Sequence, residues 1–174
     1  MLNVFVVIEH GMRRLLHVNV TTNPSANWTL QQLREVVGDA ETHSYIIHDR
    51  DSIFSKALDD SMKALGLKVL RTPVASPRAN SICERVIGTI RRECLDFIIP
   101  MSEWHVRPIL REWVGHYNRG RSHASLGHGI PEGSIVAPVV RESNGRSVPA
   151  RCRVAATPIL SGLHHEYRLE RHAA

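Results

Sequence analysis

Four short runs of apolar and β-branched residues, separated by segments with helical spacing, constrain the fold of this chain most strongly. The first, Asn3–Ile8 (NVFVVI), is continuous, which is typical of a strand buried on both faces. Residues 13–20 alternate well enough to pair back on it as a hairpin across the turn at His10 and Gly11. The remaining two runs, at residues 44–48 and 67–70, also predict strands.

Between these strands the apolar residues recur at helical spacing. The predicted helices are 28–37 with Asn27 as N-cap, 53–65 closed by Gly66, 80–95, and one from Ser102 to about Tyr117 that Pro108 should kink or delay. The order of hairpin, helix, strand, helix, strand and helix indicates an α/β domain in which helices flank a mixed sheet. After Pro131 the pattern fades into an irregular tail, with short strands expected near 151–155 and 166–169.

Charge is unevenly distributed along the 174 residues, whose formal net charge is +5. Residues 1–70 carry 7 Lys and Arg against 8 Asp and Glu, whereas residues 71–174 carry 15 against 9. All 15 basic residues of the second part are arginines, whose planar guanidinium group binds phosphate through two hydrogen bonds. This favours a nucleic-acid partner, with a simply solvated basic surface as the alternative.

Other features of the composition argue against membrane-spanning, exported, disulfide-rich and zinc-cluster proteins. No apolar run reaches the roughly 20 residues that span a bilayer, and the first residues lack the pattern of a signal peptide. The three cysteines have no CxxC spacing, so neither a disulfide framework nor a zinc cluster is indicated. We therefore expect a cytoplasmic protein without a membrane partner.

Two acidic residues stand out by position. Asp49 follows the predicted strand 44–48, at the strand end where open α/β folds bind ligands, and Glu84 lies near the start of the helix 80–95. Carboxylates that converge from a strand end and a helix can hold Mg²⁺ for phosphoryl transfer. The ordinary alternative is that Asp49 is a turn residue and Glu84 an acid favoured at a helix N-terminus.

The surroundings of Glu84 favour the first interpretation. Glu84, Gly88, Arg91 and Arg92 follow the spacing i, i+4, i+7 and i+8, so one helix face carries a carboxylate followed by two guanidinium groups. Gly88 should keep that face flat enough for a backbone to approach. A metal-binding carboxylate beside arginines that contact phosphate suits a nucleic-acid site, while an exposed salt-bridged face remains the alternative.

Several motifs, taken in order and spacing, resemble the integrase core of bacterial insertion-sequence transposases and retroviral-type integrases. The resemblance covers roughly residues 3–130. The motifs are HDRDS at 48–52, SPRAN at 76–80, CER at 83–85, GTIRRE at 88–93, YNR at 117–119 and HASLG at 123–127.

The resemblance implies a ribonuclease-H-like fold and an Asp, Asp, Glu triad that binds two Mg²⁺ or Mn²⁺ ions. It implies hydrolytic nicking of DNA ends, followed by transfer of the freed 3′-hydroxyl into target DNA, by a homo-oligomer associated with the nucleoid. By this match Asp49 is the second acid and Glu84 the third. Asn80 and Arg91 fall at family positions near DNA, and we expect Gly88, Arg92, Arg119 and Arg121 to contribute to DNA binding as well.

One departure concerns the family's first aspartate, which lies on a strand before the one that corresponds to Asn3–Ile8. No acid precedes Glu9 here, so we expect an amino-terminally shortened core in which the first, central strand is missing. The strands 3–8 and 44–48 should then keep exposed ladder edges or pair directly. Three explanations remain open: the true start of the protein lies upstream of Met1, the gene is a decayed remnant, or a separate chain supplies the rest. Whether this chain is an active enzyme is open as well.

The sequence thus predicts a truncated integrase catalytic core at 1–130 and a basic C-terminal tail at 131–174. The leading functional hypothesis is DNA integration or transposition by metal-dependent phosphoryl transfer. The alternative is a non-catalytic DNA-binding or dimerising module derived from a transposase.

Overall fold

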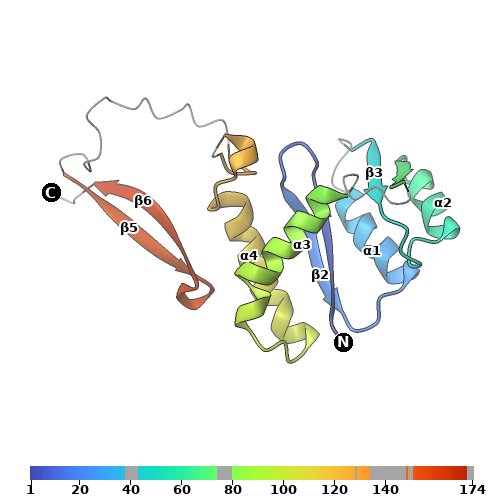
Figure 1. The fold of residues 1–174 in the computed structure, drawn as a ribbon, viewed down its shortest axis with the longest axis horizontal. Coiled ribbons are helices and arrows are strands. Elements are labelled where there is room, and N and C mark those ends of the chain that lie inside the picture. Colours follow the sequence, from blue (N-terminus) through green and yellow to red (C-terminus); the bar gives the residue numbers. More distant parts are fainter. Residues whose placement is uncertain (38–42, 74–79, 128, 134–147, 149–150, 172–174) are drawn as a thin grey trace. The chain divides into compact units, whose positions relative to one another are not determined.

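A computed structural model describes residues 1–37, 43–73, 80–127, 129–133, 148 and 151–171 (Figure 1). It confirms the α/β class, and its elements follow the predicted order closely. The strands are β1 (Asn3–Ile8), β2 (Leu15–Thr21), β3 (Tyr45–His48), β4 (Lys68–Arg71), β5 (Cys152–Ile159) and β6 (His164–Arg171). The α-helices are α1 (Ala26–Val37), α2 (Lys56–Ala64), α3 (Ser81–Glu93) and α4 (Glu103–Arg119), and short 3₁₀ turns lie at Leu95–Phe97, Ala124–Leu126 and Leu160–Gly162.

The described strands form three two-stranded sheets instead of one mixed sheet. β1 pairs with β2 antiparallel, with Val4 opposite Val20, and a register irregularity follows Val7. β3 pairs with β4 in parallel, with Ile46 opposite Val69. β5 and β6 form a long antiparallel hairpin, so the strands expected near 151–155 and 166–169 are each longer than predicted.

A compact apolar core holds the first part of the chain together. Leu33 of α1, Leu58 and Met62 of α2, and Leu67 before β4 are all buried in one cluster. Partly buried side chains from the strands pack against this cluster, namely Phe5, Val7, Ile46 and Val69. Burial of this apolar surface is the main force that holds both sheets to the two helices.

Helix starts show which polar side chains act as caps. The amide of Trp28 donates to the hydroxyl of Ser25 at 3.2 Å, and Asn27 lies inside α1, so the prediction of Asn27 as N-cap is wrong. Ser55 caps α2 through the amide of Leu58, and Ser102 accepts from the amide of His105 at the start of α4. A hydroxyl oxygen at these positions accepts from amides that no helical carbonyl can reach.

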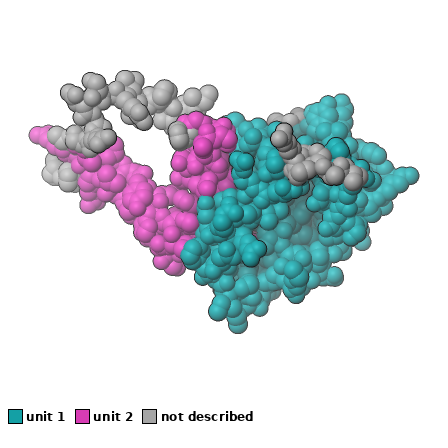
Figure 2. Space-filling view, in the orientation of Figure 1, with its two compact units in different colours: residues 1–108 teal, residues 109–174 magenta. Residues whose placement is uncertain are grey.

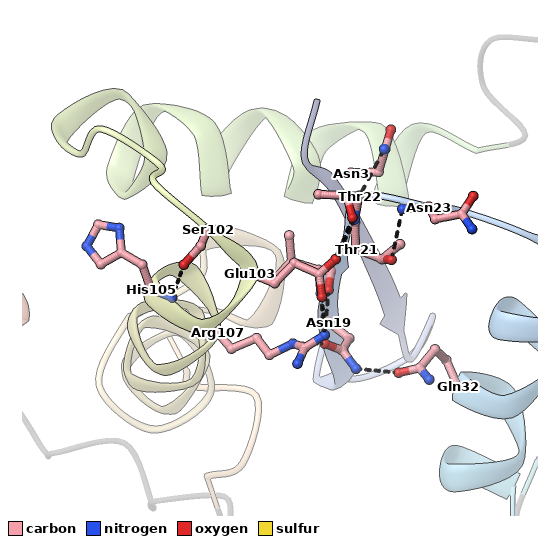
Figure 3. Close-up of polar contacts among 11 residues, drawn as sticks. Asn3, Asn19, Thr21, Thr22, Asn23, Gln32, Ser102, Glu103, His105 and Arg107 are labelled. Carbon is pink, nitrogen blue, oxygen red and sulfur yellow. Dashed lines mark hydrogen bonds and ion pairs between the residues drawn. The ribbon is translucent and has the colours of Figure 1, made fainter.

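The α4 helix runs through Pro108, which neither ends the helix nor delays its start. Its first turn is joined to the end of β2 by two charged side chains (Figure 3). Glu103 accepts from the Thr22 amide at 2.7 Å and from the Thr22 hydroxyl at 2.9 Å. Arg107 donates to the Val20 carbonyl at 3.1 Å and to Glu103 at 2.6 Å. Segments that are distant in sequence are thereby tied together.

The chain divides into two compact units, residues 1–108 and 109–174, coloured separately in Figure 2. In the second unit Trp113 is fully buried and its ring lies 5.1 Å from that of Tyr117. Trp28 of the first unit meets the Phe5 ring edge-on, whereas Trp104 is 81% exposed. Among the described residues, no helix has the length and apolar character to cross a membrane.

Candidate functional site

A cavity in the first unit brings the end of β3 beside the start of α3. Its lining includes Asp49, which directly follows β3, and Asn80 and Cys83 at the beginning of α3. Its volume is about 520 Å³. The two segments that carry the predicted acids therefore meet at one site, although 34 residues separate Asp49 from Glu84 in the sequence.

Asp49 is exposed and holds its own turn together. One carboxylate oxygen, Oδ1, accepts a hydrogen bond from the amide of Asp51 at 3.1 Å. Within the described part of the chain, the other oxygen has no hydrogen-bond partner. A turn role and a ligand role are thus compatible in this residue, because the turn uses only one of its two oxygens.

The strand end that carries Asp49 is anchored by a buried polar group that sequence reasoning missed. His48 Nδ1 lies 2.6 Å from the Asp49 carbonyl oxygen, and His48 Nε2 lies 3.0 Å from Asp59 Oδ1. Arg71 donates to the other oxygen of Asp59 at 2.7 Å. The only available signal was that Asp59 occupies the buried face of α2 between Leu58 and Met62, where an unpaired carboxylate would be costly.

Glu84 is exposed in the first turn of α3, where the helix dipole favours a negative charge. Burial raises the pKa of the neighbouring Cys83 thiol, and the negative charges of Asp49 and then Glu84 raise it further. Both carboxylates therefore raise the pKa of the same thiol. Cys83 itself is a protonated, packed thiol and not an activated nucleophile.

The exposed face of α3 carries the remaining predicted residues of this unit. Arg91 forms an exposed ion pair with Asp96 at 3.3 Å. A Cβ atom on Gly88 would lie 3.1 Å from Nη1 of Arg92, so the Arg92 guanidinium group lies over Gly88. The surface above Gly88 is therefore covered by a flexible cation and is not bare. Asn80 stands at the N-cap of α3, but its side chain does not cap the helix.

Arg119 and Arg121 belong to the second unit. Arg119 is the last residue of α4 and not a loop residue, and it pairs with Glu132 at 3.7 Å. Arg121 lies 5.8 Å over the ring of Tyr117. The motif residues around them are structural: Tyr117, Asn118 and His123 are buried, and the Asn118 amide donates to Glu132.

Asp49 and Glu84 provide some, but not all, of the oxygen ligands that a cation such as Mg²⁺ needs. Two carboxylates at one site match the one or two that Mg²⁺ takes from proteins when water and substrate phosphate supply its other oxygens. Among the described residues, however, no group of three His, Cys, Asp or Glu side chains is arranged to hold a metal ion. The residues present therefore fit a cation that depends on further ligands.

Comparison with known proteins supports the resemblance seen in the motifs. Residues 65–131 match the family described as the integrase core domain. That segment begins before β4 and includes all of α3 and α4. No curated protein sequence matches the chain.

A solved structure shows a similar fold. It is a chain in the cryo-electron-microscopy structure of the simian T-cell lymphotropic virus intasome in complex with the PP2A regulatory subunit B56 gamma. The two chains superpose with a TM-score of 0.61 at 12% sequence identity, over 95% of this chain and 60% of that one. This chain thus spans less than two thirds of the length of that relative. Residues 65–131 are thus similar in sequence to the integrase core domain family, and the fold as a whole is similar to the ribonuclease-H-like fold of a retroviral integrase.

Proposed function

We propose that this chain contributes a DNA phosphoryl-transfer site of the integrase and transposase type, in which Asp49 and Glu84 hold a divalent cation. The observation that supports it most is that the end of β3, with Asp49, and the start of α3, with Asn80 and Cys83, line one cavity. The match of residues 65–131 to the integrase core domain adds independent support.

Each side chain has a separate task in this proposal. Asp49 and Glu84 supply carboxylate oxygens to Mg²⁺ or Mn²⁺, of which the family resemblance implies two ions. A bound cation would neutralise phosphate charge and lower the barrier to attack by an oxygen nucleophile. Arg91 and Arg92, exposed on the same helix as Glu84, would hold the DNA backbone through charge-assisted hydrogen bonds.

The remaining assignments complete the proposal. Asn80 and Gly88 would lie along the DNA path on α3, and Arg119 and Arg121 would add phosphate contacts from the second unit. The DNA would be element ends and target DNA of an insertion sequence, bound by a homo-oligomer at the nucleoid. Residues 1–130 would form the catalytic core and residues 131–174 the basic tail.

Cation binding is the first test, because it does not require an active enzyme. Mn²⁺ binding to the full chain, followed by calorimetry, should weaken in both Asp49→Asn and Glu84→Gln, since each removes one anionic ligand. Asp60→Asn is the matched control, because Asp60 is exposed on α2 and pairs with Lys63. Equal Mn²⁺ affinity in the unchanged chain and the three variants would show that Asp49 and Glu84 are not cation ligands.

Activity is the second test. Mn²⁺-dependent nicking of supercoiled plasmid should appear with the full chain and disappear in Glu84→Gln. If the chain binds the cation but does not nick DNA, the assignment of Asp49 and Glu84 as cation ligands is kept and the catalytic part of the proposal fails.

A second candidate function is a DNA-binding module without catalysis. It is favoured by the exposed arginines of α3 and by the lack of a three-residue metal cluster in the described part of the chain. Binding to a DNA duplex should then weaken as salt rises, and Arg91→Ala or Arg92→Ala should each reduce the logarithmic salt slope by about 1. Salt-independent binding would contradict both functions.

A further inference from the structure

The ring of His48 contacts the candidate cation site through the backbone of Asp49. Nδ1 of His48 lies 2.6 Å from the carbonyl oxygen of Asp49. A carbonyl oxygen can only accept a hydrogen bond, so Nδ1 is the donor in this contact. The ring therefore holds the peptide group that joins residues 49 and 50, next to the Cα atom from which the Asp49 carboxylate extends.

The same peptide group belongs to the turn that orients the Asp49 carboxylate. Oδ1 of Asp49 accepts from the amide of Asp51 at 3.1 Å, and this bond closes a ring of atoms that includes the peptide group of residues 49 and 50. If that peptide group rotated, the Asp51 amide would move away from Oδ1 and the carboxylate would lose its fixed direction. A contact to the Asp49 main chain thus also controls the Asp49 side chain.

The His48 ring is itself held on its other nitrogen and on one face. Nε2 lies 3.0 Å from Oδ1 of Asp59 in α2, and both residues are only 5% exposed. Arg71 of β4 donates to the second oxygen of Asp59 at 2.7 Å. The ring of Phe54 stacks on the imidazole with the two ring centres 4.3 Å apart. Because packing and hydrogen bonds restrict the ring in this way, Nδ1 points in a fixed direction.

We propose that His48 is a positioning residue of the cation site, which fixes the direction of the Asp49 carboxylate by donating from Nδ1 to the Asp49 carbonyl. This inference rests on the proposed role of Asp49 as a cation ligand. It gives the two nitrogens of one ring different effects, since the Nδ1 bond governs cation affinity and the Nε2 bond mainly contributes to stability. Removal of a group that orients a metal ligand typically weakens metal binding about 10- to 100-fold.

Two substitutions of His48 separate the two bonds, because each keeps a donor at the place of one ring nitrogen. The amide nitrogen of asparagine is attached to Cγ, as Nδ1 is, and that of glutamine lies one atom further out, as Nε2 does. His48→Asn therefore keeps a donor for the Asp49 carbonyl, whereas His48→Gln keeps one for Asp59. Both variants lose the stacking on Phe54, so a comparison between them is free of this effect.

Calorimetry with Mn²⁺ and urea denaturation of the full chain should rank the two variants in opposite orders. His48→Gln should bind Mn²⁺ about tenfold more weakly than the unchanged chain, and His48→Asn should recover most of the affinity. Stability should fall more in His48→Asn, because Asp59 then lacks this donor. Phe54→Leu is the matched control: it loses the stacking but keeps both bonds, so it should lower stability and leave Mn²⁺ affinity unchanged.

Hydrogen exchange keeps the test independent of cation binding. His48→Gln should speed exchange of the Asp51 amide, which donates to Asp49, and His48→Asn should not. The amide of Trp28, which donates to Ser25 at the start of α1, reports general loosening of the fold. If no protein binds Mn²⁺ but the Asp51 amide responds as expected, the proposed function fails and the positioning of Asp49 stands.

Two results would overturn the positioning role. The first is Mn²⁺ affinity and exchange of the Asp51 amide that simply follow stability in both His48 variants and in Phe54→Leu. The second needs no variant and therefore decides the matter even if a variant does not fold. A proton–nitrogen correlation spectrum of the histidine rings in the unchanged chain should show a proton on Nδ1 of His48, and an unprotonated Nδ1 could not donate to the Asp49 carbonyl.

Discussion

His48 Nε2 lies 3.0 Å from Oδ1 of Asp59, and both side chains are buried. The same imidazole lies 2.6 Å from the Asp49 carbonyl oxygen through Nδ1 and stacks on the ring of Phe54 at 4.3 Å. Asp59 in turn accepts from Arg71 of β4. One carboxylate on α2 thus fixes the ends of two parallel strands, including the end from which Asp49 projects.

Replacement of Asp59 should be strongly destabilising. Asp59→Ala leaves His48 buried without its hydrogen-bond partner, and leaving a buried polar group unsatisfied in this way costs about 1–3 kcal/mol of unfolding free energy. Urea denaturation followed by circular dichroism measures the loss. Asp60→Ala, at the neighbouring exposed position, should change stability by only about 0.5 kcal/mol or less. Similar losses in the two variants would show that the His48 contact contributes little.

The thiol of Cys83 reports on the candidate acids. Because the charges of Asp49 and Glu84 raise its pKa, Asp49→Asn or Glu84→Gln should lower that pKa and increase the thiolate fraction at mildly alkaline pH. Alkylation of Cys83 by iodoacetamide, followed by mass spectrometry of its peptide, should therefore be faster in both variants than in the unchanged chain. Asp60→Asn should leave the rate unchanged. A rate that responds to neither acid would place the two carboxylates away from this sulfur.

The link between β2 and α4 should depend on pH. Hydrogen bonds from the Thr22 amide and hydroxyl lower the pKa of Glu103 below its ordinary value of 4.5, and Arg107 lowers it further. A carboxyl group with a lowered folded-state pKa stabilises the fold above its unfolded value and loses this contribution as the pH falls through the folded value. Glu103→Gln should therefore lower the melting temperature more at pH 7 than at pH 3. An equal decrease at both pH values would mean that the charge of Glu103 is not involved.

Two tryptophans of α4 should respond very differently to truncation. Trp113 is fully buried, so Trp113→Ala should cost about 3–5 kcal/mol. Trp104 is exposed with Arg107 5.4 Å over its ring, so Trp104→Ala should cost about 0.5–1 kcal/mol. Chemical denaturation of the two variants gives the comparison directly. A large loss in Trp104→Ala would mean that its side chain is covered in solution.

The local spacing of apolar residues was enough to locate most strands and helices. The strand Asn3–Ile8 matches its prediction residue for residue, and the helices differ by a few residues at their ends. The errors have local causes. Ser25 and Asn27 are both good cap residues, and the hydroxyl of Ser25 is the one that meets the Trp28 amide. Pro108 lies inside α4 and removes one amide donor, and the helix nevertheless continues through it.

The sequence by itself determined the strand and helix periodicity, the basic second part, and the ordered motifs around Asp49 and Glu84, because each depends on residues close together in the chain. Only the tertiary structure decided that β1 and β3 do not pair, that Asp59 holds His48 and Arg71, and that Trp113 is buried while Trp104 is not. These features are contacts between segments distant in sequence. Their formation depends on which surfaces pack together in three dimensions, and residue spacing along the chain does not encode that choice.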